Sequence, residues 1–339
     1  MENPIWHRQG MHWSYPYGWQ QPVKTEQWVT ECYLSRYPEQ RFIQFIGFPW
    51  ATLIDCQRKH QQERARLYLD ALAQLPPKMT IIRATAIQHI YAQDLWSMLK
   101  RLKFTDVFWS HATNQVQQVD GIRIHPLPLY PVCCAKGNLK PETTPSLKDR
   151  RYLYGFIGTY DALLYLTPVR QWLFELPPAP DGLIEPIDAW HYEKTVYQEQ
   201  IAGAMMSSVE RYDQQEREQR YRDVLQQTVF SLCPSGSGSN SIRLWESLGA
   251  GCIPVLMADT LRLPGTAAEW DQAIVRIPEN RESIRALPKT LRQLSQNEQN
   301  MRRMRQNCVS LWRRYGLESD MSEVQQVLEK SLRTSAKMS

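Results

Sequence analysis

The sequence lacks the features that mark membrane-spanning and secreted proteins. No run of about 18 apolar residues occurs in the chain. Its N-terminal segment also has no apolar core of the kind that a signal peptide needs. We therefore expect a cytoplasmic protein. Work at a membrane face is compatible with this expectation, because peripheral attachment needs no spanning segment.

Cysteine pairs and blocks of one charge are also missing. The seven cysteines include no CxxC pair and no Cys/His spacing typical of a zinc site, so we expect mostly buried thiols in a reducing compartment. Lys and Arg number 40 against 35 Asp and Glu, and the two signs are interspersed. This balance argues against a nucleic-acid partner and is compatible with small anionic ligands.

The chain does contain a repeated alternation of apolar strands and helices, which is typical of parallel sheets covered on both faces. The first half predicts strands at residues 42–48, 79–84 and 106–109 and helices at residues 59–75 and 92–102. The second half predicts strands at residues 152–157, 182–187, 230–233, 253–257 and 273–277, and helical segments at residues 168–175, 192–227 and 279–333. Residues 133–150, which are polar and contain Pro and Gly, predict an interdomain linker. The aromatic residues before position 40 indicate a packed irregular segment, with a sugar-stacking platform as the alternative.

Residues 230–264 form the most informative stretch, a predicted strand, loop, helix and strand. The loop of small residues from Pro234 to Asn240 leads into a helix whose free N–H groups and dipole favour an anion. It is not a P-loop, because Ser241 is not preceded by the Lys of that motif. Arg243 suits a phosphate and Glu246, one turn further, suits a ribose diol. The alternative for these two side chains is an exposed ion pair with each other. The alternative for the loop is a flexible turn without a ligand.

Residues spread through this stretch carry a specific resemblance. They are Phe230, Leu232, Cys233, Pro234, Gly236, Ser241, Arg243, Glu246, Gly251, Cys252, Ile253, Pro254, Val255, Asp259, Leu263 and Pro264. Their pattern resembles the signature of the exostosin family, glycosyltransferase family 47. The similarity extends over residues 151–304, with a strand ending at Gly158, a following Arg170 and a tail at residues 270–277. Weaker similarity to the family occurs at residues 88–90, 109–111 and 126–131.

The resemblance implies the GT-B fold, an α/β architecture of two Rossmann-like domains that face each other across a cleft. We expect an N-terminal acceptor-binding domain at residues 1–140, a C-terminal nucleotide-sugar-binding domain at residues 141–315, and a final helix within residues 316–339 that packs back on the first domain or completes the second. The donor-binding residues implied are Gly158, Arg170, Ser235, Gly236, Ser239, Ser241, Arg243 and Glu246. Many family members carry Arg where this chain has Ser235, so Arg243 or Arg170 is expected to supply that phosphate contact.

The resemblance also implies inverting transfer of a sugar from a nucleotide sugar, usually a UDP-sugar, to a saccharide or lipid-linked saccharide acceptor in surface polysaccharide biosynthesis. No Asp lies two positions from another, so the chain has no DxD motif, and we expect neither a metal nor a cofactor. A helix dipole and Arg side chains would then stabilise the leaving diphosphate. The alternative function is a catalytically silent GT-B subunit that binds saccharide or supports a partner glycosyltransferase.

An inverting transfer needs a base across the cleft from the diphosphate. Three residues lie near expected carboxyl ends of strands, where open α/β sheets place their ligands. They are His111, Asp55 and His89, in that order of preference. The alternative role of Asp55 is that of a helix cap. For the two histidines the alternative is a packed, hydrogen-bonded position in a loop.

Overall fold

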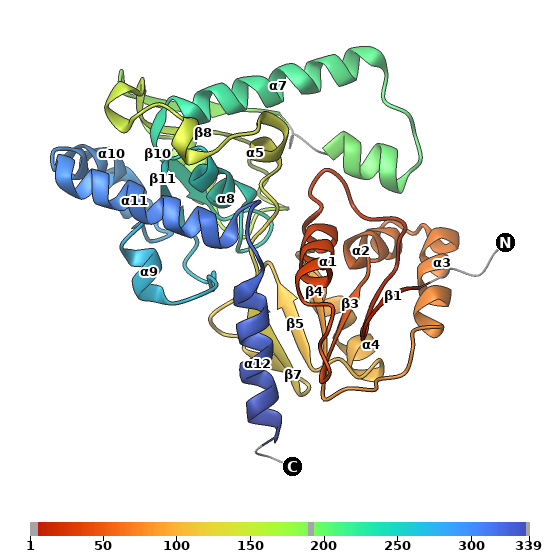
Figure 1. Ribbon diagram of the computed structural model, residues 1–339. Coiled ribbons are helices and arrows are strands. Elements are labelled where there is room, and N and C mark those ends of the chain that lie inside the picture. The colour runs from red at the N-terminus through yellow and green to blue at the C-terminus, as the bar shows by residue number, and fades with distance from the viewer. Residues whose placement is uncertain (1–5, 189–192, 337–339) are drawn as a thin grey trace.

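The computed structural model describes residues 6–188 and 193–336, and it shows two α/β domains (Figure 1). The strands of the N-terminal domain are β1 (His7–Gln9), β2 (His12–Ser14), β3 (Ile43–Gly47), β4 (Ile82–Ile87), β5 (Asp106–Trp109), β6 (Gln118–Val119) and β7 (Ile122–Pro126). They form a seven-stranded sheet in the order β1-β2-β3-β4-β5-β7-β6. Pairing is parallel from β2 to β7, and the edge strands β1 and β6 pair antiparallel.

The C-terminal domain has a second sheet, in which every pair of neighbouring strands is parallel. Its strands are β8 (Tyr152–Gly158), β9 (Gly182–Pro186), β10 (Thr228–Pro234), β11 (Ile253–Met257) and β12 (Val275–Arg276). The order is β12-β11-β10-β8-β9. Strand β10 is buried along its whole length, as expected for a central parallel strand. Two parallel sheets in succession confirm the expected pair of Rossmann-like domains.

Helices cover both faces of the N-terminal sheet. They are α1 (Thr25–Arg36), α2 (Trp50–Arg58), α3 (Gln62–Ala73), the 3₁₀ turn η1 (Ala92–Leu95) and α4 (Trp96–Arg101). Neighbouring strand residues point to opposite faces: Val107 packs in the core beneath α2, α3 and α4, and Phe108 packs in the core beneath α1. The sequence pattern missed α2, because its residues from Trp50 to Cys56 are all buried and no polar stripe marks an outer face.

The C-terminal sheet is covered in the same way. Its helical elements are α5 (Val132–Gly137), α6 (Val169–Phe174), α7 (Ser208–Gln226), α8 (Ile242–Gly249), α9 (Ala267–Asp271), α10 (Arg281–Ser295) and α11 (Glu298–Tyr315), with short 3₁₀ turns η2 (Pro141–Thr143) and η3 (Leu147–Asp149). The π-helix η4 (Lys194–Ile201) instead contacts α2, and its Ile201 is buried in the core of the N-terminal domain. The predicted linker at residues 133–150 is wrong, because α5 packs Cys133 and Cys134 into one core with Trp245 of α8. Tyr192, where the expected helical stretch begins, lies outside the described residues.

The structure also decides two finer expectations from the sequence, one against it and one for it. The predicted strand at residues 79–84 begins instead at Ile82, because Met79 and Ile81 are exposed and only Ile82 onward pairs with β3. The aromatic N-terminal segment is packed: Trp6 and Tyr15 are buried, with ring centroids 5.8 and 5.5 Å from that of Phe48. These contacts favour the packing interpretation over a sugar-stacking platform.

The final helix, α12 (Ser322–Ala336), leaves the C-terminal domain and lies along the N-terminal sheet (Figure 1). Ser331 of α12 donates a hydrogen bond to Asp106 of β5 at 2.7 Å, and Tyr33 of α1 donates to Gln325 of α12 at 2.7 Å. Val324 and Leu328 are buried in the same core as Phe45. The chain therefore connects its two domains at two places, after β7 and again before α12. None of the helices in the described ranges is long and apolar enough to span a bilayer.

Candidate active site

The strand–loop–helix–strand unit predicted from residues 230–264 is confirmed. Strand β10 ends at Pro234, Ser241 takes the N-cap position, and α8 begins at Ile242. Inside the loop, the Gly236 N–H donates to the Gly238 carbonyl at 3.0 Å. Because β8 and β10 are parallel, Gly158 at the end of β8 and this loop lie at the same edge of the sheet.

Two arginine side chains lie beside this loop. Arg170 of α6 is buried, and it donates through Nε to the Ser235 carbonyl at 2.9 Å and through Nη1 to the Thr159 carbonyl at 3.1 Å. Arg243 of α8 donates to the Ile157 carbonyl at the end of β8. The two guanidinium groups lie 5.6 and 4.6 Å from the ring centroid of Phe156.

Neither arginine has a carboxylate partner within the described residues. Their polar contacts are carbonyl oxygens and, for Arg170, the Tyr165 hydroxyl at 3.3 Å. Burial, together with the charge of Arg243, lowers the pKa of Arg170 to about 10, so the guanidinium remains charged at neutral pH. Two cations held together without an acid create a site of positive potential at a helix N-terminus, which suits a phosphate-bearing ligand.

Glu246 takes a position that the sequence did not suggest. Its side chain is buried, and its two oxygens accept from the Cys133 N–H at 2.9 Å and from the Tyr221 hydroxyl at 2.8 Å. The alternative, an exposed ion pair with Arg243, is therefore not formed. In this structure Glu246 joins α5, α7 and α8 through these two hydrogen bonds. Burial raises the pKa of its carboxyl.

Glu279 is a residue of this region to which sequence reasoning gave no role. It follows β12, and its carboxylate accepts from the hydroxyls of Ser235 and Thr167 and from the Asp259 N–H. The Ser235 hydroxyl is thus turned toward Glu279, whereas the Ser235 carbonyl is held by Arg170. Arg170 therefore contacts the backbone at Ser235, the position where many family members carry Arg. The only sequence signal for Glu279 was its place directly after the 270–277 tail.

The loop also contacts the N-terminal domain, through residues that follow β5. Asn240 donates from its backbone N–H to His111 Nδ1 at 3.2 Å and from its side chain to the Ser110 carbonyl at 2.7 Å, and Ser239 donates to the His111 carbonyl at 3.1 Å. Gly238 must be glycine here, because a Cβ would lie 2.3 Å from His111 Nδ1. The structure brings His111, Ser239 and the loop together as an interdomain contact.

This contact argues against His111 as the base in this domain arrangement. Its ring is buried, and Nδ1 already accepts the Asn240 N–H. Burial lowers its pKa to about 3, so at neutral pH the ring is uncharged and a weak proton acceptor. The alternative role, a packed and hydrogen-bonded loop histidine, describes His111 as the structure shows it.

The other two candidates form a pair. Asp55 is in the body of α2, so the cap interpretation is wrong, and its Oδ1 lies 3.1 Å from His89 Nε2. His89 Nδ1 accepts the Tyr91 N–H at 3.1 Å, which leaves Nε2 to donate to Asp55. Gln20 donates to the other carboxylate oxygen at 2.6 Å. The sequence spacing gave no indication of this Asp–His pair, because 34 residues separate the two.

Glu26 of α1 is a second acidic residue near this pair that sequence reasoning missed. It is buried at the N-terminus of α2, where its carboxyl accepts from the Ala51 N–H at 3.1 Å and from the Gln88 N–H at 3.0 Å. Burial raises its pKa to about 8, and the charge of Asp55 adds to this shift. Within residues 6–188 and 193–336, no three His, Cys, Asp or Glu side chains, these included, are grouped closely enough to bind a metal ion.

The fold defines a two-domain α/β protein of GT-B architecture, with two arginines beside a strand–loop–helix unit in its second domain. The comparison with protein families makes the assignment specific: the model of the Exostosin GT47 domain matches residues 83–294. The chain belongs to this family of glycosyltransferase domains. The match begins in β4. It therefore includes residues 88–90, 109–111 and 126–131, where the sequence showed only weak similarity to the family.

Curated relatives agree with this assignment. Mouse exostosin-1 is 28% identical over 185 residues, which cover 53% of this chain and 22% of the relative. A probable glucuronoxylan glucuronosyltransferase from Arabidopsis thaliana is 38% identical over 69 residues, 20% of this chain and 15% of the relative. The chain thus matches less than a quarter of the length of these relatives.

Among solved structures, Anabaena Alr3699/HepE in complex with UDP and glucose aligns over 96% of this chain and 99% of its own, at 10% identity and a TM-score of 0.43. The pneumococcal O-GlcNAc transferase GtfA in complex with UDP and GlcNAc aligns over 86% and 57%, at 14% identity and a TM-score of 0.40. Similarities at this level do not by themselves establish a common fold.

Proposed function

We propose that the protein is an inverting, metal-independent glycosyltransferase that moves a sugar from a nucleotide sugar, with UDP as the expected nucleotide, to a saccharide acceptor. The acceptor in this proposal is a saccharide or lipid-linked saccharide of surface-polysaccharide or glycan biosynthesis, and the enzyme works in the cytoplasm or at a membrane face. Family membership and the names of the glucuronosyltransferase relatives support the reaction class.

The observation that carries the proposal is the pair Arg170 and Arg243, two cations beside the loop with no carboxylate partner in the described chain. A nucleotide diphosphate supplies the missing negative charge. The N-terminus of α8 adds unpaired N–H groups and the positive end of its dipole. The negative charge that develops on the leaving diphosphate is then stabilised by groups already in place, without a metal.

Asp55 is the base in this proposal, with His89 as the residue that positions it. The His89 Nε2–H fixes one carboxylate oxygen of Asp55. The carboxylate accepts a proton from the acceptor hydroxyl as the glycosidic bond forms and the bond to the diphosphate breaks. Ile90, which follows His89, approaches the donor loop, because a Cβ on Gly238 would lie 2.7 Å from it. Asp55 is 4% exposed, so an acceptor reaches it only after a local opening.

A thermal-shift screen with UDP, other nucleotides and a panel of sugar nucleotides tests the proposal. A ligand that binds only the native state raises the melting temperature, by an amount set by its concentration relative to Kd. We expect UDP and at least one UDP-sugar to do so. If no nucleotide changes the melting temperature, the catalytically silent subunit becomes the better interpretation.

Metal independence has its own test, which is transfer activity with and without EDTA. We expect activity to survive chelation, because Arg170, Arg243 and the α8 N-terminus stabilise the diphosphate in place of a cation. Complete loss of activity in EDTA, restored by added manganese, would refute this part of the proposal.

A further inference from the structure

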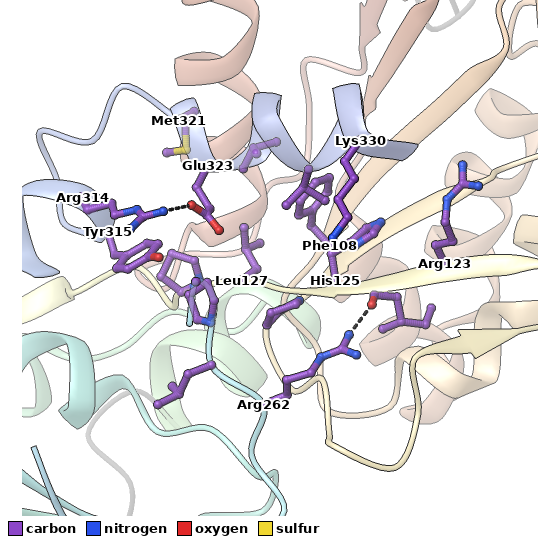
Figure 2. A pocket seen from close by; sticks show the side chains of 18 of the residues that line it. Phe108, Arg123, His125, Leu127, Arg262, Arg314, Tyr315, Met321, Glu323 and Lys330 are labelled. Atoms are coloured by element: carbon purple, nitrogen blue, oxygen red, sulfur yellow. Dashed lines mark hydrogen bonds and ion pairs between the residues drawn. The ribbon is translucent and has the colours of Figure 1, made fainter. Parts of the chain in front are cut away.

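A pocket of about 590 Å³ lies away from the donor loop, where both domains meet α12 (Figure 2). The described residues that line it include none of those assigned to the donor site or to the base. The N-terminal domain contributes Phe108 and Leu127, the C-terminal domain contributes Arg262 and Tyr315, and α12 contributes Lys330. Figure 2 shows Lys330 entering from α12 and Arg262 from the opposite wall.

The charges of this pocket are unbalanced. Four of its lining side chains are Arg or Lys, and one is an acid, Glu323. Arg123 is paired with buried Asp106 at 2.8 Å, and Arg314 is paired with Glu323 and Glu269. For Arg262 and Lys330 the described part of the chain supplies no carboxylate partner. A surplus of two positive charges thus remains in the pocket.

Two buried polar atoms in the pocket also lack partners. Arg262 Nε and the Tyr315 hydroxyl have no hydrogen-bond partner among the residues that the structure describes. Tyr315 is 3% exposed, and its hydroxyl lies against Gly265, where a Cβ would come within 2.4 Å. Buried polar groups are nearly always satisfied, so the wall formed by Arg262 and Tyr315 is short of hydrogen-bond acceptors. Phe108, Leu127 and other apolar side chains line the rest of the pocket.

Arg262 connects this pocket to the contact between the domains. Its backbone N–H donates to the Ala112 carbonyl at 2.9 Å, and Ala112 follows His111, the residue that contacts the donor loop. Its guanidinium donates to the Ile124 carbonyl of β7. A ligand held by Arg262 and by Lys330 of α12 would therefore contact both domains at once.

We propose that this pocket binds a small organic anion, with a phosphate or carboxylate group recognised by Arg262 and Lys330 and an apolar body on Phe108 and Leu127. The pocket is a second ligand site, separate from that of the donor. Because its walls come from both domains, occupancy stabilises the domain arrangement that the structure shows.

Phenyl phosphate is a suitable probe, because it combines an anionic group with an apolar ring. Isothermal titration of the full chain measures its Kd in the wild type, in Lys330→Gln and in Arg333→Gln. Lys330 is exposed, so its substitution leaves the fold intact, and Arg333 is the matched control because it is an exposed cation on α12 outside the pocket. We expect Lys330→Gln to weaken binding by about tenfold or more, as for loss of one charged hydrogen bond, and Arg333→Gln to bind like the wild type.

A third variant separates the pocket from the donor loop. Arg243→Gln removes a cation beside the loop. With saturating UDP present to occupy the proposed donor site, we expect this variant to bind phenyl phosphate as the wild type does. The proposal is overturned if phenyl phosphate shows no saturable binding, if Lys330→Gln binds it as tightly as the wild type, or if Arg243→Gln is the variant that loses binding.

Discussion

Replacing Arg243 with Gln separates a ligand-binding role from a structural one. Arg243 lies 4.6 Å from the Phe156 ring centroid and 5.0 Å from that of Tyr221, and each cation–π contact is worth about 0.5–1 kcal/mol at a partly exposed site. That loss is partly offset by relief of the repulsion from Arg170. We expect the free energy of unfolding without ligand to change by less than about 1 kcal/mol.

Donor affinity should respond much more strongly to the same substitution. A charge-assisted hydrogen bond to a phosphate contributes about 1.5–3 kcal/mol, which corresponds to a roughly 10- to 150-fold rise in the Kd for UDP. Urea unfolding of the ligand-free protein and titration with UDP measure the two quantities. Arg243→Lys is the matched control, because it keeps the charge but not the planar fork, and it should recover part of the affinity. A variant that loses several kcal/mol of stability and binds UDP as the wild type does would refute the reasoning.

Three further predictions follow from buried carboxyl groups. Glu246→Ala removes the acceptor of the Tyr221 hydroxyl and the Cys133 N–H, so urea unfolding should show that the free energy of unfolding falls by about 2–5 kcal/mol. Glu246→Gln, the control, should lose less. Equal stability of Glu246→Ala and the wild type would contradict this prediction. Because burial raises the pKa of Glu26 from 4.5 to about 8, the folded state keeps a proton that the unfolded chain releases, and stability should fall as pH rises between these values. Glu26→Gln should flatten that decline, by at most about 1.4 kcal/mol per pH unit, when unfolding is compared at about pH 5 and about pH 8; an unchanged slope would contradict the assignment. Asp55→Asn should abolish transfer and retain UDP binding, and a variant with wild-type turnover would remove Asp55 from the reaction.

The parts of the fold that could be predicted from sequence are those with strong local signals. Strands β5 and β11 match the predicted bounds, since short apolar runs between turn residues define them locally. Helices α2 and α5 were missed for the opposite reason: one is buried on all sides, and the other is short and lies in a polar stretch. The cysteines follow the expectation, with six of the seven buried and none in a disulfide.

The sequence by itself determined the family, the two-domain α/β class and the strand–loop–helix at residues 230–249, because each depends on patterns of residues close together in the chain. Only the tertiary structure decided which polar and charged side chains lie next to one another. It joined Arg170 to Arg243, paired Asp55 with His89, turned Glu246 inward toward Tyr221, and buried His111 against the loop. These arrangements depend on how strands and helices from distant parts of the chain meet at one edge of each sheet, and desolvation and neighbouring charges then set the protonation of each group.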